Sequence, residues 1–384
     1  MGYEMIEGAT TARSFLLMAP RGLRNVGNSC YMNSLLQAYL CCHPTFTDVV
    51  INFDTTVLHR YPENHAVRCM CALKKLFVCL LSGQEGPVDP SEFMDLFLSN
   101  GEQQDISDAN FQFLQMVFDA LKVTGQNNLQ KLFFGTKFQK PLQPSDNREI
   151  SNEVVAFPIG PGDFSLPLSG TNSVMEAMLQ ATTQETDSTT YKLYYNFPSC
   201  LWVSLNRFTF QKETNTVEKL HTNFNLERTL DVTPLSITSP EEFQLRRQAE
   251  CMEKELSLGE KLQRQFLGVG AFLDENKPNP STLTQEEYTT TLNVLKKYYE
   301  GIDSQMKSLR QQHKELSSKL LCGGRKYILH AIWNHIGDAQ RGHYVAYVRA
   351  SHDGNLWWKC NDSAVTLIHS FDEVMIECRG GSSN

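Results

Sequence analysis

The sequence lacks three features that would assign it to common classes of protein. Its 11 cysteines include no pair at CxxC spacing, so no zinc site of the four-cysteine kind is expected. No apolar run approaches the about 18 residues that a membrane-spanning helix needs. Lysine and arginine number 35 against 43 aspartate and glutamate, a net charge of −8 that does not favour binding to a nucleic-acid backbone. We therefore expect no metal, no cofactor, no nucleic-acid partner and no membrane association.

The sequence also lacks a recognisable secretory signal, because the apolar stretch at residues 14–19 is short and poorly flanked. An odd number of cysteines without such a signal is typical of reduced thiols, which predicts a cytoplasmic or nuclear protein. Two of these thiols, Cys69 and Cys71, lie in an apolar stretch with helical spacing at residues 66–81. We expect both to pack in the core, where free cysteine is common.

What is present is an ordinary globular composition, 41% hydrophobic and 20% charged, over 384 residues, which is long for one simple core. Apolar residues recur at helical spacing up to residue 121, and short extended runs between Pro, Gly and Asn follow to residue 230 and return from residue 327. The predicted fold class is therefore α+β. The expected parts are an N-terminal leader (1–20), the first part of the main domain (21–237), a helical insertion (238–326) and the second part of the main domain (327–384).

The helical insertion carries a heptad pattern in its second half. Its apolar residues alternate intervals of three and four, which predicts a coiled-coil helix. A weaker pattern at residues 241–266 and a Pro/Gly/Asn-containing break between the two predict a protruding hairpin of two helices. The hairpin either packs only on itself or also forms a homodimer surface, and the sequence favours neither. The second-half pattern consists of Leu292, Leu295, Tyr299, Ile302, Met306, Leu309, His313, Leu316 and Leu320.

A candidate nucleophile stands where a polar loop runs into an amphipathic helix. Cys30 is the first residue of this predicted helix, at the end that carries the unpaired N–H groups and the positive dipole. That position favours thiolate over thiol and is one known way to lower a cysteine pKa, although a cysteine there can also be inert. Asn25, five residues earlier, is either an oxyanion donor together with the Cys30 backbone N–H or simply a loop-forming residue.

A candidate base lies about three hundred residues further along. His343 opens a predicted strand after a glycine-containing loop, and Asn361 ends the next predicted strand. A two-stranded hairpin would place them side by side, so that the Asn361 carbonyl oxygen accepts from imidazole Nδ1–H and leaves Nε2 facing the sulfur. Cys, His and Asn in these roles form the papain-type version of the catalytic triad.

These segments resemble the ubiquitin-specific protease family of deubiquitinating cysteine peptidases. The Cys30 box at residues 21–37, the Gly342-His343-Tyr344 box and the Asn361-Asp362 ending carry the resemblance. It extends over residues 21–376 and includes three further segments: Gln103-Gln104-Asp105, Leu132-Phe133-Phe134-Gly135 and Leu205-Asn206-Arg207-Phe208. A subgroup of this family has a long helical arm at the corresponding point, which mediates self-association.

The resemblance implies a papain-like fold with thumb, palm and fingers, plus an inserted helical hairpin arm. It implies removal of ubiquitin from lysine side chains, with Cys30 as nucleophile, Asn25 at the oxyanion, His343 as base, Asn361 as orienting residue and Asp362 assisting. The expected partners are ubiquitin, ubiquitinated proteins and a second copy bound through the arm. The residues expected to bind the ubiquitin tail, which ends Leu-Arg-Leu-Arg-Gly-Gly, are Gln103, Asp105, Asp108, Phe208, His335 and Tyr344.

The sequence departs from the family pattern in ways that keep alternatives open. Asp108 stands where the family usually has the longer glutamate, and the CxxC pairs that many members carry in the fingers are missing. The family's last palm strand, an apolar run after two glycines, has no counterpart after Gly380-Gly381, which would leave a sheet strand without its neighbour. The alternatives are a non-catalytic ubiquitin-binding scaffold and a protease for another ubiquitin-like modifier.

Overall fold

The structure is a computed structural model that combines helices and sheets, in agreement with the predicted α+β class. It divides into two compact units, Met1–Ser236 with Arg325–Asn384 and Ile237–Gly324, which are described separately below. The described residues are 1–5, 19–41, 43–98, 104–126, 129–139, 155–168, 170–186, 189–211, 215–275, 285–320, 325–338, 342–350 and 355–380. No helix among them is both long and apolar enough to cross a membrane.

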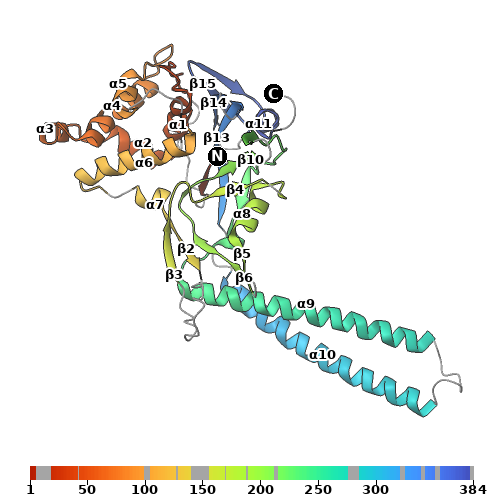
Figure 1. Ribbon diagram of the computed structural model, residues 1–384. Coiled ribbons are helices and arrows are strands. Elements are labelled where there is room, and N and C mark those ends of the chain that lie inside the picture. The colour runs from red at the N-terminus through yellow and green to blue at the C-terminus, as the bar shows by residue number, and fades with distance from the viewer. Residues whose placement is uncertain are drawn as a thin grey trace. The chain divides into compact units, whose positions relative to one another are not determined.

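Three helices of the first unit begin after a short polar side chain that caps them. Asn64, Asp105 and Ser370 each accept a hydrogen bond from a backbone N–H in the first turn of the helix that follows. Figure 1 shows α1 to α6 gathered beside strands β13 to β15. The helices are α1 (Cys30–Leu40), α2 (Pro44–Ile51), α3 (Val57–Arg60), α4 (His65–Leu81), α5 (Ser91–Phe97), α6 (Ile106–Val123), α7 (Gln130–Phe133), α8 (Val174–Thr182) and α11 (Phe371–Cys378).

The main sheet of the first unit has the strand order β16-β15-β14-β13-β1-β8, with β12 also paired to β13. Every pairing in this sheet is antiparallel. Its strands are β1 (Gly2–Met5), β8 (Cys200–Trp202), β12 (Thr229–Asp231), β13 (Lys326–Gly337), β14 (Gly342–Arg349), β15 (Trp357–Asn361) and β16 (Ala364–Ile368).

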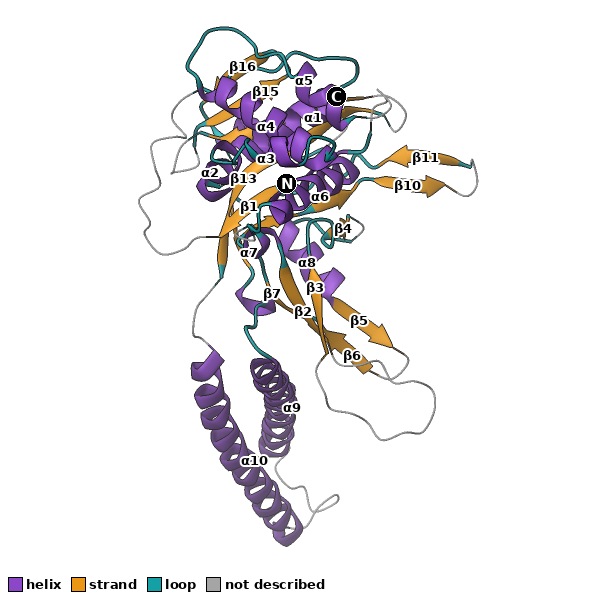
Figure 2. Ribbon diagram, turned by 90° about the vertical axis from the view of Figure 1, so that its left-hand side faces the viewer, coloured by secondary structure: helices purple, strands orange, loops and turns teal. Residues whose placement is uncertain are grey.

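Smaller sheets complete the first unit. Figure 2 shows the β10–β11 pair and the β5–β6 pair as ribbons apart from the main sheet. The remaining strands are β2 (Gly135–Gln139), β3 (Val155–Ile159), β4 (Ser165–Pro167), β5 (Thr183–Thr186), β6 (Thr189–Lys192), β7 (Tyr194–Asn196), β9 (Ser204–Asn206), β10 (Phe208–Gln211) and β11 (Thr216–Lys219).

Two hydrophobic cores lie on opposite faces of the main sheet. Along β14, Tyr344 belongs to the core formed with α1, α4 and α6, whereas Val345 and Tyr347 belong to the core formed with β7, β8 and α11. This division follows from the strand geometry, because successive side chains point to opposite faces. Cys69 and Cys71 are both buried in the helical core, as predicted from the spacing of their segment.

The N-terminal segment differs from the expectation of a loosely held leader. Residues 2–5 form β1, which lies between β8 and β13 and pairs with both. The expectation is therefore wrong for these residues, because four residues with no hydrophobic period gave no signal that two strands far along the chain would bind them. β1 is thus the strand that joins β8 to β13.

The second unit consists of two long helices, α9 (Pro240–Glu275) and α10 (Gln285–Leu320). They pack against each other, with Ala249, Leu316 and Leu320 buried between them. Gly259 allows a close approach, because a Cβ there would lie 2.1 Å from Met306 Sδ. α10 runs without a break through Gly301, a residue that costs about 1 kcal/mol relative to alanine within a helix.

Candidate active site

The loop before α1 turns sharply to present Cys30 at the helix start. Gly27 and Asn28 have left-handed backbones, with φ of 64° and 59°. The loop is held by its own side chains: Ser29 Oγ accepts from the Val26 N–H at 2.9 Å, and Asn25 Oδ1 accepts from the Ser29 N–H at 3.2 Å. α1 begins at Cys30, the residue predicted from the sequence.

The Cys30 thiol is buried, and its electrostatic state differs from the prediction. Burial raises its pKa, a hydrogen bond from the Tyr344 backbone lowers it, and the negative charge of Asp362 raises it further. The prediction of a lowered pKa is therefore wrong for the unbound chain, because desolvation outweighs the helix N-terminus. The bond to Tyr344 also shows that the sulfur lies beside the residue that follows His343.

His343 and Asn361 come together on the β14–β15 hairpin. Nε2 of His343 lies 2.6 Å from Asn361 Oδ1, so the predicted hairpin brings the two side chains into contact. The nitrogen differs from the prediction: Nε2 rather than Nδ1 faces Asn361, which leaves Nδ1 for a further partner. The tautomer that donates from Nε2 to the amide oxygen has an unprotonated Nδ1, which can accept a proton.

Asp362 links this hairpin to the segment that carries the cysteine. It occupies the β15–β16 turn with a left-handed backbone, φ 47°. Oδ1 accepts from Asn33 Nδ2 and Oδ2 from Asn25 Nδ2, both at 2.8 Å. His343 Nε2 lies 3.9 Å from Asp362 Oδ2. Both carboxylate oxygens thus hold an amide from the α1 side, and the turn and the cysteine helix are fixed relative to each other.

The hydrogen bonds to Asp362 involve two asparagines, Asn25 and Asn33, whose roles differ from the expectation. Asn25 was expected to direct its amide to the oxyanion, but one Nδ2 hydrogen is donated to Asp362, so only the second remains for a substrate. Asn33 was not predicted to have a role. It lies three residues after Cys30 on α1, which places both on one side of the helix, and this spacing was the signal available in the sequence.

The backbone reinforces the same junction. The Leu23 N–H donates to the Asp362 carbonyl oxygen at 2.9 Å. A Cβ at Gly22 would lie 2.2 Å from the Ser363 carbonyl oxygen, so only glycine allows this approach. The loop before α1 therefore rests directly on the turn that carries Asp362.

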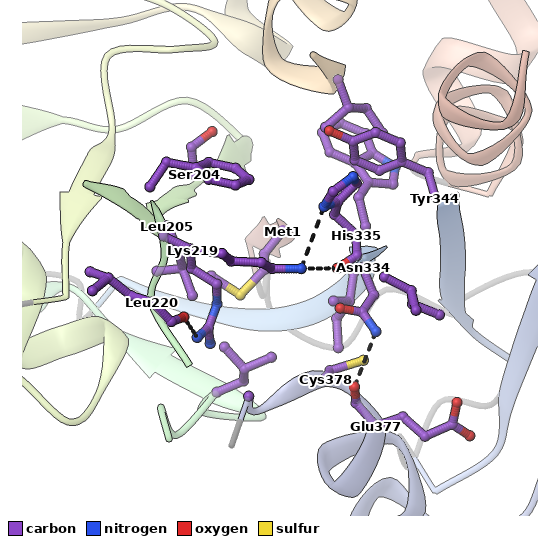
Figure 3. A pocket seen from close by; sticks show the side chains of 18 of the residues that line it. Met1, Ser204, Leu205, Lys219, Leu220, Asn334, His335, Tyr344, Glu377 and Cys378 are labelled. Atoms are coloured by element: carbon purple, nitrogen blue, oxygen red, sulfur yellow. Dashed lines mark hydrogen bonds between the residues drawn. The ribbon is translucent and has the colours of Figure 1, made fainter. Parts of the chain in front are cut away.

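A cleft of about 220 Å³ (Figure 3) reaches this region only through Tyr344, the residue after His343, because Cys30, His343, Asn361 and Asp362 are not among its lining residues. Four of the predicted tail-binding residues line it: Asp105, Phe208, His335 and Tyr344. Asp108 is not among the lining residues and lies exposed in the first turn of α6. Gln103 lies outside the described residues.

One wall of the cleft joins Asp105, from the Gln103-Gln104-Asp105 segment, to Tyr344, from the Gly342-His343-Tyr344 box. Asp105 caps α6 by accepting from the Ser107 N–H at 2.7 Å and also bonds the Tyr344 hydroxyl. Burial, followed by the charge of Asp105, raises the pKa of Tyr344. The Tyr344 hydroxyl therefore stays protonated at neutral pH and donates to Asp105.

His335 lies beside Tyr344 in the same cleft, and its ring centroid is 4.7 Å from that of Tyr344 and 6.2 Å from that of Phe208. Lys219 Nζ donates to the carbonyl oxygens of His335 and Gly337 at 2.6 and 2.9 Å. Burial and the Lys219 charge lower the pKa of His335, so its ring is neutral at pH 7. Lys219 was not predicted to contribute.

The sequence of the chain is similar to a known protein family. The family described as "Ubiquitin carboxyl-terminal hydrolase" matches residues 21–377 of the chain. The chain belongs to this family. The matched range includes both the Cys30 segment and the hairpin with His343 and Asn361, which are the parts of this hydrolase-family chain that meet at Asp362.

Individual relatives are distant. Ubiquitin carboxyl-terminal hydrolase 47 of Drosophila melanogaster is 26% identical over 97% of this chain and 24% of its own length. Human ubiquitin carboxyl-terminal hydrolase 28 is 24% identical over 61% of this chain and 24% of its own. Human ubiquitin carboxyl-terminal hydrolase 22 is 25% identical over 90% and 62%. The chain thus spans about a quarter of the length of the first two relatives.

Proposed function

We propose that the chain is a thiol-dependent deubiquitinase that hydrolyses the isopeptide bond between the C-terminal glycine of ubiquitin and a lysine side chain. One observation carries the proposal. The His343–Asn361 pair sits on a hairpin whose next residue, Asp362, bonds both the Cys30 helix and the loop before it. This junction supports the proposal, because activation of a thiol needs a base near the sulfur and a residue that orients the base.

In the proposed reaction, His343 takes the Cys30 proton and the thiolate sulfur attacks the glycine carbonyl carbon. The second Asn25 Nδ2 hydrogen and the Cys30 backbone N–H stabilise the oxyanion. The C–N bond then breaks, the lysine amine leaves with the proton from His343, and a thioester remains. His343 next removes a proton from water, the hydroxide attacks the thioester carbon, and the sulfur leaves and is reprotonated. Asn361 orients His343 throughout, and Asp362 holds the two sides together.

The cleft is the proposed site for the ubiquitin tail. The Asp105 carboxylate can pair with a tail arginine through charge-assisted hydrogen bonds, while Phe208, His335 and Tyr344 enclose the chain. Gln103 and Asp108 are proposed to contact the tail nearer its globular end. The two glycines have no side chains, so a narrow passage toward Cys30 selects for them.

Several finer assignments belong to the same proposal. The helices α1–α6 correspond to a thumb, the main sheet to a palm and the smaller sheets to fingers. Residues 21–237 and 327–384 form the two parts of the catalytic domain, and residues 238–326 form an inserted helical arm with coiled-coil packing that serves as a homodimer surface. A cytoplasmic or nuclear location is proposed from the free thiols.

The test uses ubiquitin that carries an electrophile at its C-terminus. We expect a covalent adduct of one ubiquitin per chain, with the modified peptide containing Cys30, and hydrolysis of a ubiquitin–fluorophore substrate. Cys251→Ser, which replaces an exposed thiol on α9, should label normally, whereas Cys30→Ala should not label at all.

Two results would contradict the proposal. A folded chain that binds ubiquitin without labelling would be a scaffold, and labelling only by a different modifier ending in Gly-Gly would change the substrate. A ubiquitin probe that lacks the last two glycines serves as the negative control.

A further inference from the structure

The main sheet contains a strand that is remote in sequence from both of its neighbours. β1 pairs with β13 in the register Met5↔Tyr327 and with β8 in the register Glu4↔Cys200. Further bonds extend the pairing to β8 at both ends, with the Met1 nitrogen and carbonyl oxygen bonded to Val203 and the Met5 N–H bonded to the Ser199 carbonyl oxygen, all at 2.8 Å. Adjacent strands lie about 4.8 Å apart, so β8 and β13 are about 10 Å apart and cannot bond each other directly.

The space between β8 and β13 fits a strand with glycine at one position. A Cβ at Gly2 would lie 2.4 Å from the Trp202 ring. That ring is itself fixed, because it stacks on Trp333 with centroids 4.4 Å apart and lies against Tyr39 of α1. Recognition is therefore by main-chain hydrogen bonds, with a steric filter at one residue, which is how added strands are recognised elsewhere.

The same rings connect β1 to the candidate active site. Trp333 Nε1 donates to the Ser34 carbonyl oxygen of α1, the helix that begins at Cys30. β13, which carries Trp333, also carries His335 and pairs with the strand that carries His343. A strand that joins β13 to β8 therefore helps to position both α1, which begins at Cys30, and β14, which carries His343.

We propose that the space between β8 and β13 is a strand-binding slot, that residues 1–5 are its occupant, and that filling the slot joins β8 to the part of the sheet that carries the site. The occupant binds through its own pairing and not through the chain that follows it. Met1, at one end of the slot, lines the same cleft as Cys378 and Gly380 (Figure 3). The slot is thus within reach of a chain that continues from the C-terminal side.

The first experiment uses the full chain with Gly2→Val, a substitution that keeps strand propensity but meets the Trp202 ring. Hydrogen exchange followed by mass spectrometry should show about tenfold faster exchange in peptides covering 199–203 and 326–332, because their partner strand is displaced. Peptides covering the β14–β15 pairing should change less. Gly301→Val, the same change at a position with nothing within 4 Å of the new Cβ, should leave both peptides as in the parent.

The second experiment is a circular permutant that starts at residue 6 and ends Asn384-Met1-Gly2-Tyr3-Glu4-Met5. Residues 381–384 then span from Gly380 to Met1, and four residues reach up to about 14 Å. We expect parental protection of both peptides in the permutant, and loss of that protection when Gly2→Val is added.

Unchanged exchange in Gly2→Val, or a folded permutant in which both peptides are unprotected, would overturn the proposal. If Gly2→Val does not fold, the permutant decides. Neither experiment measures catalysis, so a negative result would count against the strand-binding slot without counting against the proposed function.

Discussion

The two compact units are stabilised in different ways. In the first, Tyr39 alone contacts four rings, those of Phe46, Phe113, Phe133 and Trp202, inside a core that surrounds it on all sides. In the second, two helices share one narrow seam flanked by exposed pairs such as Arg310–Glu260, whose side chains are 50% and 48% exposed. Exposed pairs of this kind contribute little to stability, so the seam carries most of it.

This difference in packing indicates which unit can hold reactive side chains in a fixed geometry. A core that packs in three dimensions fixes side chains against each other, and Cys30, His343 and Asn361 all come from the first unit. A seam between two helices fixes side chains along one line only. Changes to the side chains that form the site in the first unit should therefore alter catalysis, whereas changes to the helix seam in the second should alter stability and leave catalysis unchanged.

The largest effect is expected from His343→Ala. Removing the base should lower kcat/KM for a ubiquitin–fluorophore substrate by about 10² to 10⁴-fold, the usual contribution of general acid–base catalysis. His369→Ala, at an exposed histidine of the same unit, is the control and should retain parental activity. Parental turnover in His343→Ala would remove the proposed base.

Asp362→Ala comes next, because it breaks the junction without touching the nucleophile. The loss of two hydrogen bonds to a charged acceptor, each worth about 1.5–3 kcal/mol, should lower the melting temperature and reduce kcat by about 10 to 100-fold. Asn33→Ala combined with Asp362→Ala should cost less than the sum of the single changes. Simple additivity, or an equal loss in the exposed Asp95→Ala, would count against a junction role.

A smaller effect is expected in the alkylation rates of one thiol from each unit. Because burial raises the pKa of Cys30, the thiol carries less thiolate at pH 7 than ordinary cysteine, and it is also shielded from solvent. Iodoacetamide should alkylate Cys30 about tenfold more slowly than the exposed Cys251, and the rate should rise as pH passes 9. Peptide mass spectrometry over a pH series measures both rates. Faster alkylation of Cys30 below pH 7 would contradict the raised pKa.

The smallest effect is confined to the second unit. Gly259→Leu should lower the melting temperature of α9 and α10, since it meets Met306, at a cost of about 1–3 kcal/mol. Gly301→Leu should raise the melting temperature, because the site is open and leucine stabilises the helix by up to about 1 kcal/mol relative to glycine. Circular dichroism measures both shifts, and kcat/KM should stay unchanged in each. A change in turnover would show that the contrast between the units does not hold.

The sequence predicted the parts of the site that depend on local pattern. The start of α1 at Cys30 and the β14–β15 hairpin follow from spacing, so the approach of His343 to Asn361 was foreseeable. The state of the Cys30 thiol was not, because burial depends on residues far away in the chain. The roles of Asn33 and Lys219, and the pairing of β1, likewise depend on partners that no nearby pattern indicates.

Gly342 sits directly beneath the His335 ring, and a Cβ there would lie 2.0 Å from Nε2. Even alanine at this position would displace the imidazole, and the same Cβ would lie 2.8 Å from the Ile336 carbonyl oxygen, in the strand segment that pairs with His343. A single methyl group would thus disturb both a wall of the cleft and the backbone that positions the candidate base. Gly342→Ala is accordingly expected to weaken substrate binding and turnover together.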